Sequence, residues 1–513
     1  MYNEEETRIL SYFFTNLDKP VFAAKNFHPE VWALMQARYS RSKDGLRESF
    51  LQLLKEDPAN YDSLKNALAS NNQASMDNAV SKAIQFMEKW VLGYGHSSVA
   101  EGAVVGIGLE GISSLASDVV ENNRLASYIE KSTRYVSFGN DSFFIPKEII
   151  GTKHEARVKA CFEDLFKTYM DLHAPVLEYI QKESPLKEGM NDSAWKRASA
   201  ARRFDAIRYL LPAATKTSLG WTLNARQLAH AINKLLSHPL EEMRELGLLL
   251  QQEGKKALPS LLKYTGEKNY FIETEKQLRS KQLTKNGEKV KLVDYPEKIE
   301  EKIISAIIFK YSNQDYQTCF NQASKMTSSE REELLDSFLG RQEEFDYPMR
   351  ELEYSDFTFE GLMDYGGFRD VQRHRMATIS QQLLTCFHGF DTPPDIIAAG
   401  VEKQYAQAMN HAKEVFQEVY EDNPYAAQYL VPRGFKHRFL FKANLRTLYH
   451  FIKLRSQPQG HYSYVEFAKK MHSIMIDQFP LAMKYCVCAK DLEELGRLKA
   501  EQRLEDKIKK GTI

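Results

Sequence analysis

Two stretches of the chain, far apart in sequence, carry side chains suited to binding a phosphorylated ligand. The first, residues 122–138, reads NNRLASYIEKSTRYVSF and ends in a run of hydroxyl, guanidinium and phenol groups. The second, residues 373–385, reads RHRMATISQQLLT and begins with two arginines around a histidine. Guanidinium forks and hydroxyl groups are the donors that phosphate and the imide edge of a uracil require. Both stretches therefore indicate binding of an anionic, planar, hydrogen-bonding molecule.

The two stretches are complementary halves of one pattern. With Arg124 aligned on Arg375, they share an arginine, an alanine and a hydroxyl residue in register. The first stretch has two asparagines where the second has Arg373 and His374. The second has leucine and threonine where the first has Ser132 and Arg134. Each stretch keeps the half that the other lacks, so a complete site needs both.

The same order of elements recurs around each stretch. Arg208-Tyr209-Leu210-Leu211-Pro212 in the first half corresponds to Gln428-Tyr429-Leu430-Val431-Pro432 in the second. An Asn-x-Arg element follows each of these, and the second half continues to Arg455, where the first half has Leu235. An internal repeat of this length, with its elements in the same order, indicates a tandem duplication.

The residues alone support binding more firmly than catalysis. Taken singly, each arginine is best explained as an ordinary surface ion pair, and only the recurrence in two copies argues for a shared site. His374 lies between two cations, and we expect no nearby carboxylate to favour its charged form. It should therefore be a neutral imidazole that stacks or donates a hydrogen bond, rather than a general base.

The pattern Arg-His-Arg, seven residues, Ser, x-Arg-Tyr resembles the signature of the flavin-dependent thymidylate synthases (ThyX), although neither copy carries all of it. The resemblance implies a fold of two tandem copies in the α/β (α+β) class, each a small twisted sheet flanked by long helices. It also implies a site shared between copies, with FAD as cofactor and dUMP as substrate. The implied substrate-binding residues are Glu130, Ser132, Thr133, Arg134, Arg208, Arg373 and Arg455, and the implied cofactor-binding residues are Ser40, Ser98, Arg373, His374, Arg375, Asn224, Arg226, Asn444, Arg446 and His450.

The reaction implied is the reductive methylation of dUMP to dTMP, with methylenetetrahydrofolate and NADPH as co-substrates. No cysteine lies in either stretch to attack the pyrimidine, and the family that the chain resembles needs none. The resemblance gives Arg455 the role of placing positive charge over the pyrimidine and Ser132 that of orienting the nucleotide. The losses in each copy leave two alternatives, a binding homologue without turnover and a structural or interaction protein of the same ancestry.

Apolar spacing predicts the elements that must position these residues. The first 90 residues and the span 153–201 have helical periodicity, and Pro212 should end a helix just after Arg208. Gly95 to Glu101 has the form of a helix start, where capping is the simplest role for Glu101. We expect a first copy over 1–260, a linker or surface hairpin over 261–300 and a second copy over 301–513.

The amino-acid composition limits the classes of partner that the chain is expected to bind. Lys+Arg and Asp+Glu balance at 69 each, so no overall field favours nucleic acid or an anionic membrane. Five cysteines without a C-x-x-C pair, an acidic start and no long apolar run predict a cytoplasmic protein with free thiols and no metal site. By the resemblance, two tandem chains should pair as a homodimer that reproduces a four-copy assembly.

Overall fold

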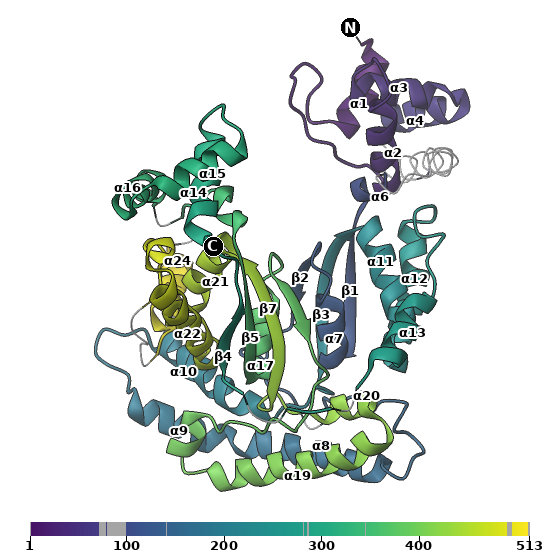
Figure 1. The fold of residues 1–513 in the computed structure, drawn as a ribbon. Coiled ribbons are helices and arrows are strands. Elements are labelled where there is room, and N and C mark those ends of the chain that lie inside the picture. Colours follow the sequence, from purple (N-terminus) through teal and green to yellow (C-terminus); the bar gives the residue numbers. More distant parts are fainter. Residues whose placement is uncertain are drawn as a thin grey trace. The chain divides into compact units, whose positions relative to one another are not determined.

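The computed structural model describes residues 2–70, 78, 99–139, 141–280, 282–284, 287–343, 345–489 and 495–510. The expected helix start at Gly95 to Ser98, most of residues 71–90 and the turn at 285–286 lie outside these ranges. The chain forms two compact units. Unit 1 comprises 1–110, 125–130 and 218–280, and unit 2 comprises 111–124, 131–217 and 281–513. Each unit is labelled by element in Figure 1.

Unit 1 begins with four helices whose apolar faces form a common core. They are α1 (Glu4–Phe13), α2 (Pro29–Tyr39), α3 (Leu46–Lys55) and α4 (Pro58–Ser70). A capping box between Asn3 and Glu6 starts α1, and a proline at the first turn starts α2. Phe13, Phe14 and Phe50 pack edge to face at the centre of the core. The helical periodicity of this part of the sequence is therefore confirmed where the structure describes it.

The remainder of unit 1 is a small sheet with helices. Strands β1 (Val104–Ser113), β3 (Lys216–Asn224) and β2 (Ser127–Glu130) lie in the order β1-β3-β2, and β2 pairs antiparallel with β3. After β3 come α11 (Ala225–Leu236), α12 (Glu241–Ala257) and α13 (Asn269–Leu278). A Cβ atom on Gly247 would lie 2.9 Å from the backbone nitrogen of Leu236, so only glycine permits α12 to pack this closely on α11.

Unit 2 contains a four-stranded antiparallel sheet. Its strands are β4 (Val290–Asp294), β5 (Asp356–Asp364), β7 (Lys436–Asn444) and β6 (Thr378–Gln381), in the order β4-β5-β7-β6. β5 and β7 lie side by side along their full length (Figure 1). Gly361 faces Phe439 across this pair, and a Cβ atom there would collide with the phenyl ring. The segment expected as a linker or hairpin, 261–300, thus contains α13 and a strand of this sheet.

Helices from both sequence copies pack together in unit 2. The helices of the first copy are α7 (Ser114–Glu121), α8 (Glu155–Asp171), α9 (His173–Glu183) and α10 (Asp192–Ile207). Those of the second copy are α14 (Ile299–Lys310), α15 (Tyr316–Lys325), α16 (Ser328–Leu339), α17 (Tyr365–Gln372), α18 (Pro394–Ala398), α19 (Glu402–Asp422), α20 (Pro424–Ala427), α21 (Leu445–Arg455), α22 (Tyr462–Gln478), α23 (Pro480–Met483) and α24 (Leu498–Lys509). α8 and α19 lie side by side (Figure 1). The predicted helical span 153–201 is confirmed.

The two copies meet in unit 2 through equivalent residues. Pro212 and Pro432 form an antiparallel bridge, and each follows a short 3-10 turn, Arg208–Leu210 (η1) or Gln428–Leu430 (η3). The nitrogen after Pro212 donates to Val431 O at 2.9 Å, and the nitrogen after Pro432 donates to Leu211 O at 3.0 Å. This reciprocity is the pattern of a two-fold contact between like segments. The repeat expected from the sequence is therefore an internal dimer.

The fold class is the one expected: helices with two small antiparallel sheets, in two copies. Among the described residues, no helix is both long enough and apolar enough to cross a membrane.

Candidate active site

Elements of both copies position a cluster of buried and half-buried charged side chains in unit 2. From the first copy, α10 carries Asp205 and runs into the 3-10 turn that begins at Arg208, and the turn after residue 130 carries Arg134. From the second copy, α17 carries Asp370, and α21 ends at Arg455. Pro212 and the reciprocal bridge to Pro432 hold the two contributions against each other. Residues retained by different copies are thus brought to one place.

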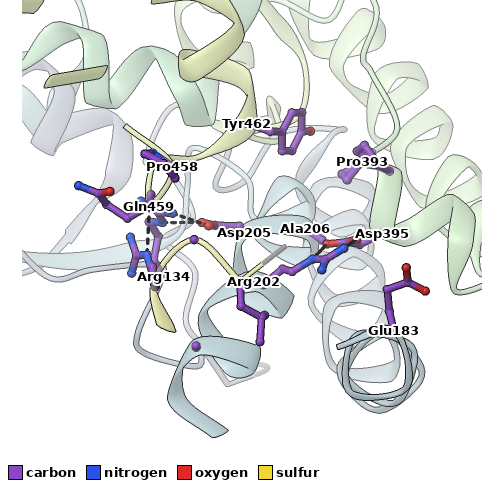
Figure 2. A pocket seen from close by; sticks show the side chains of 16 residues that line it. Arg134, Glu183, Arg202, Asp205, Ala206, Pro393, Asp395, Pro458, Gln459 and Tyr462 are labelled. Atoms are coloured by element: carbon purple, nitrogen blue, oxygen red, sulfur yellow. Dashed lines mark hydrogen bonds and ion pairs between the residues drawn. The ribbon is translucent and has the colours of Figure 1, made fainter. Parts of the chain in front are cut away.

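Arg134 is held by an acid that the sequence reading did not include. Its Nε and Nη2 donate to the two carboxylate oxygens of Asp205, a bidentate pair (Figure 2). Nη2 also lies 3.5 Å from Gln459 O, and Nη1 lies 3.4 Å from the hydroxyl of Tyr464. Arg134 is 9% exposed. Its fork therefore faces Asp205, which leaves Nη1 as the nitrogen best placed for another acceptor.

Arg208 is the most buried arginine of the cluster, and two of its nitrogens lack a hydrogen-bond partner among the described residues. It is 3% exposed, and its Nη1 donates to Thr133 Oγ1 at 3.4 Å. Asp205 lies 3.9 Å from Nε and Asp370 lies 4.0 Å from Nη2. Both distances exceed hydrogen-bond length, and neither nitrogen has a hydrogen-bond partner in the described part of the chain. A buried donor without an acceptor is costly, so this position favours an additional oxygen ligand.

Arg455 and His374 define the second-copy side of the cluster. Arg455 Nε donates to His374 Nε2 at 2.8 Å, and its Nη1 lies 3.6 Å from Asp370. Because a guanidinium only donates, Nε2 must carry the lone pair, and the imidazole is neutral with its proton on Nδ1. Burial, and then the charge of Arg455, hold the pKa of His374 well below its usual range. The neutral imidazole expected from the sequence agrees with this geometry.

Burial and the arginines act in opposite directions on the two acids. Burial alone would raise the pKa of Asp205, but Arg134, His461 and Arg208 outweigh it and lower the pKa to about 2. For Asp370, burial is likewise outweighed, mainly by Arg208, and its pKa is lowered. Both carboxylates are therefore ionised at neutral pH and hold the guanidiniums at fixed positions.

A cavity of about 320 Å³ opens beside the Arg134–Asp205 pair (Figure 2). One end is lined by these two side chains, Arg497 and the backbone of 458–460, and the other by the ion pair of Arg202 with Asp395. Arg208, Asp370 and Arg455 do not line it. The Arg134–Asp205 pair thus separates the cavity from the rest of the charged cluster. Among the described residues, no group of three or more His, Cys, Asp and Glu side chains is placed to hold a metal ion.

Comparison with known proteins identifies the family. The model for the family described as thymidylate synthase complementing protein matches residues 33–260 and again 291–481. The chain belongs to this family.

Full-length relatives share the tandem length. A UPF0159 protein of Chlamydia pneumoniae is 32% identical over 98% of both chains, and the UPF0159 protein Ta1429 of Thermoplasma acidophilum is 29% identical over 82% of this chain and 91% of its own. A flavin-dependent thymidylate synthase of Clostridium tetani is 27% identical over 34% of this chain and 68% of its own. The match to a protein named for flavin dependence therefore spans about one copy.

Three residues of unit 2 that the resemblance assigned to cofactor binding contact other parts of the chain. Asn444 caps α21 by accepting from Thr447 N at 2.9 Å. Arg446 donates to Pro348 O at 2.6 Å and to Glu353 at 2.9 Å. His450 is exposed, with its ring 5.8 Å from that of His374. Asn444 and Arg446 are therefore held in place by hydrogen bonds within unit 2.

Four further predicted residues of unit 2 differ in how exposed their side chains are. Arg373 and Arg375 are exposed on either side of the buried His374. Ser132 is half-buried and accepts from Arg134 N at 3.2 Å, and Thr133 is buried beside Arg208. The hydroxyls thus lie next to the first-copy arginines of the cluster.

The remaining predicted residues fall in unit 1 or outside the described ranges. Asn224 caps α11 by accepting from Gln227 N at 3.0 Å, and Arg226 pairs with Glu101. Ser40 ends α2, where its hydroxyl donates to Ala37 O at 2.7 Å. The structure places Glu130 at the end of β2, also in unit 1. Ser98 lies outside the described residues, so the capping role of Glu101 has no described partner, whereas its ion pair with Arg226 is present.

Sequence reasoning missed the acids of the cluster. The expectation that no carboxylate lies near His374 was wrong, because Asp370 is one helical turn earlier and raises the pKa of His374 against the larger effects of burial and Arg455. Asp205 is three residues before Arg208, within one turn. An acid one turn from a signature arginine was the available signal, but its partner Arg134 is distant in sequence and could not be foreseen.

Proposed function

We propose that this chain is an FAD-dependent thymidylate synthase that converts dUMP to dTMP, with methylenetetrahydrofolate and NADPH as co-substrates. The observation that carries the proposal is the meeting, within unit 2, of Arg134 and Arg208 from one copy with His374 and Arg455 from the other. Each copy lacks what the other supplies. One composite site per chain follows from this arrangement.

The charged cluster suits the phosphate of a nucleoside monophosphate. Arg134, Arg208 and Arg455 carry three positive charges, and Asp205 and Asp370 carry two negative ones, which leaves one positive charge. Two buried nitrogens of Arg208 have no hydrogen-bond acceptor among the described residues. Phosphate oxygens accept from guanidinium forks with good geometry. Nη1 of Arg134 would hold the phosphate, with Arg208 and the hydroxyls of Ser132 and Thr133 beside it.

The second-copy side suits a flavin and the pyrimidine. A neutral His374, an adjacent imidazole at His450 and the exposed guanidinium of Arg375 form a set of donors and flat rings compatible with an isoalloxazine. When bound, FAD supplies the hydride for the reductive methylation. Arg455, oriented by His374 and Asp370, would place positive charge over the anion that develops on the pyrimidine.

One observation favours an alternative, a homologue that binds nucleotide or flavin without turnover. The fork of Arg134 is closed by Asp205, and Arg455 is engaged by His374. A ligand must therefore use the outer nitrogens or displace these partners. Binding without catalysis would follow if the arginines cannot reorient.

Turnover and binding assays separate the two functions. Purified chain supplied with FAD, dUMP, NADPH and methylenetetrahydrofolate should form dTMP, and Arg455→Lys, which keeps the charge but loses the planar fork, should lower turnover about a hundredfold. Lys453→Arg, two residues earlier on the same helix, is the matched control. Thermal shifts with FAD and dUMP, without dTMP formation, would leave the binding homologue.

The assembly is a further part of the proposal. We expect two chains to pair, so that four copies are present as in the family's homotetramers. Light scattering should then give about twice the 59.2 kDa of one chain.

A further inference from the structure

The end of the chain reaches the Arg134–Asp205 pair. Residues 495–497 line the cavity, and α24 follows them directly. This segment lies beyond residue 481, where the family match ends. Whatever it adds to the site is therefore outside the family's signature.

Arg497 lies beside Arg134 at the wall of the cavity. Its Nε donates to Gln459 O at 3.3 Å, the same carbonyl that Arg134 approaches, and its guanidinium lies 4.9 Å from the ring centre of Tyr135. Nη1 is buried and has no hydrogen-bond partner among the described residues. Burial, together with the like charge of Arg134, lowers the pKa of Arg497. The guanidiniums of Arg134 and Arg497 thus line the same wall of the cavity, and Nη1 of Arg497 can still donate a hydrogen bond to a ligand.

Two contacts fix Arg497 there. A Cβ atom on Gly496 would lie 2.0 Å from Pro458 O, so the backbone at this position packs directly on 458–459. α24 then docks on α10, where Arg197 pairs with Glu501 and Glu505, each at 2.7 Å. α10 is the helix that carries Asp205. The position of Arg497 is therefore tied to the same helix as the acid at the centre of the site.

We propose that Arg497 completes the phosphate-binding end of the nucleotide site, as a specificity-determining residue that the C-terminal segment delivers. The inference rests on the proposed function, because it assigns the phosphate of the nucleoside monophosphate to the cavity end between Arg134, Arg497 and the 458–460 backbone. At this end of the cavity, Arg134 and Arg497 lie beside one carboxylate, that of Asp205, which leaves one net positive charge. That charge favours an anionic group such as a phosphate.

The other end of the cavity is a poorer place for an anion. Arg202 is neutralised there by a bidentate pair with Asp395, at 3.0 and 2.7 Å, and Glu183 adds a carboxylate at the exposed rim. Pro393 and Pro394 line the same end. An uncharged part of the ligand fits this end better.

The test compares the affinities of dUMP and deoxyuridine, which differ only in the phosphate. In calorimetry on the full chain, Arg497→Ala should weaken dUMP binding about tenfold and leave deoxyuridine binding unchanged. Gly496→Ala, which keeps the arginine but pushes the segment off Pro458, should show the same selective loss. Arg503→Ala, an exposed arginine of α24, is the matched control and should bind both ligands as the parent chain does.

The outcomes separate this inference from the proposed function. Unchanged dUMP affinity in Arg497→Ala overturns the inference, even if the chain makes dTMP. A selective, Arg497-dependent loss of dUMP or inorganic phosphate binding supports it, even if the chain makes no dTMP. A parent chain that binds neither dUMP nor inorganic phosphate overturns it as well. Circular dichroism of Arg497→Ala, expected to match the parent chain, ensures that a loss of binding is not a loss of fold.

Discussion

The two copies in unit 2 place very different side chains at equivalent positions. Arg208 in the first copy reaches Thr133 and two ionised aspartates, whereas Gln428 in the second accepts from Leu384 N at 3.1 Å and donates to Tyr425 O at 3.2 Å. Both side chains are buried. Arg208 lies among charged groups, whereas Gln428 lies among neutral groups with which it forms hydrogen bonds. The first copy thus has charged groups at this position, whereas the second copy has hydrogen bonds between neutral groups.

The helices at the local two-fold show the same divergence. Asp118 in α7 and Arg369 in α17 occupy equivalent places relative to the two signature stretches, and they pair with each other at 3.3 Å. In a homodimer, equivalent residues on the axis are identical and cannot form an ion pair with each other. Fusion of the copies has made this asymmetric contact possible.

Breaking that contact should have the largest effect on stability. Arg369 is 2% exposed and also binds Glu121 at 3.0 Å and Ser117 at 3.1 Å. Arg369→Ala would leave two carboxylates buried without their partner, at a cost of about 4–5 kcal/mol in the free energy of unfolding. Urea unfolding should show this loss. The exchanged pair Asp118→Arg with Arg369→Asp should recover part of it, and no recovery would contradict the pairing.

Substitutions at Arg134 and at the equivalent Thr385 should differ strongly in their effect on the free energy of unfolding. Arg134→Ala leaves the half-buried Asp205 without its bidentate partner, so we expect a loss of about 3 kcal/mol and no measurable dUMP binding. Thr385 stands in the position equivalent to Arg134, and its buried hydroxyl has no hydrogen-bond partner in the described part of the chain. Thr385→Ala should change stability by less than about 0.5 kcal/mol.

A double variant separates binding from folding in this comparison. Arg134→Ala with Asp205→Ala removes both charges, so the free energy of unfolding should recover while dUMP binding stays lost. Recovery of binding would mean that Arg134 takes no part in the site. Calorimetry on the intact chain should give one dUMP per chain, and two would mean that the equivalent place in the second copy also binds.

The sequence predicted what is local or repeated, and not what depends on distant partners. The helices followed from periodicity, the equivalence of Pro212 with Pro432 from the repeat, and the two small sheets from the family resemblance. The strand at 290–294 was missed because its lysine and aspartate suit an exposed loop, and only its pairing with β5 makes it a strand.

The residues of the candidate site were likewise predicted only in part. Its arginines followed from the signature, since they recur at fixed spacing. Asp205 did not, because a carboxylate acquires its role only when folding brings Arg134 to it from 71 residues away. Arg497 lies outside both repeats, so no internal comparison could indicate it.

Acid should destabilise the charged site in two overlapping pH ranges. His461 Nε2 lies 3.2 Å from Asp205 O, and burial, helped by Arg208, lowers the pKa of His461 to about 3. Unfolded chains take up this proton below about pH 6.5, so its stabilising effect is complete above that pH and is lost toward pH 3. The lowered pKa of Asp205, about 2, gives an effect that is present above about pH 4 and lost toward pH 2.

His461→Gln isolates the first of these ranges. Between pH 6.5 and 5, the slope of the free energy of unfolding against pH should fall by about 1.4 kcal/mol per pH unit relative to the parent chain. Urea titrations at several pH values measure this slope. An unchanged slope would mean that His461 is protonated in the folded chain.

The smallest expected difference lies between two ion pairs that recur in the copies. Arg226 pairs with Glu101 in unit 1, where the side chains are 50% and 54% exposed, and Arg446 pairs with Glu353 in unit 2, where they are 33% and 20% exposed. Water screens the exposed pair, so Arg226→Ala should cost at most a few tenths of a kcal/mol. Arg446 also donates to Pro348 O, and Arg446→Ala should cost about 1 kcal/mol. Hydrogen exchange at the first turns of α11 and α21 measures each loss locally, because the lost contacts are made by the second residue of each helix. Equal losses in the two helices would show that the copies have not diverged at this position, which would confine the divergence to the charged cluster and the contact at the local two-fold.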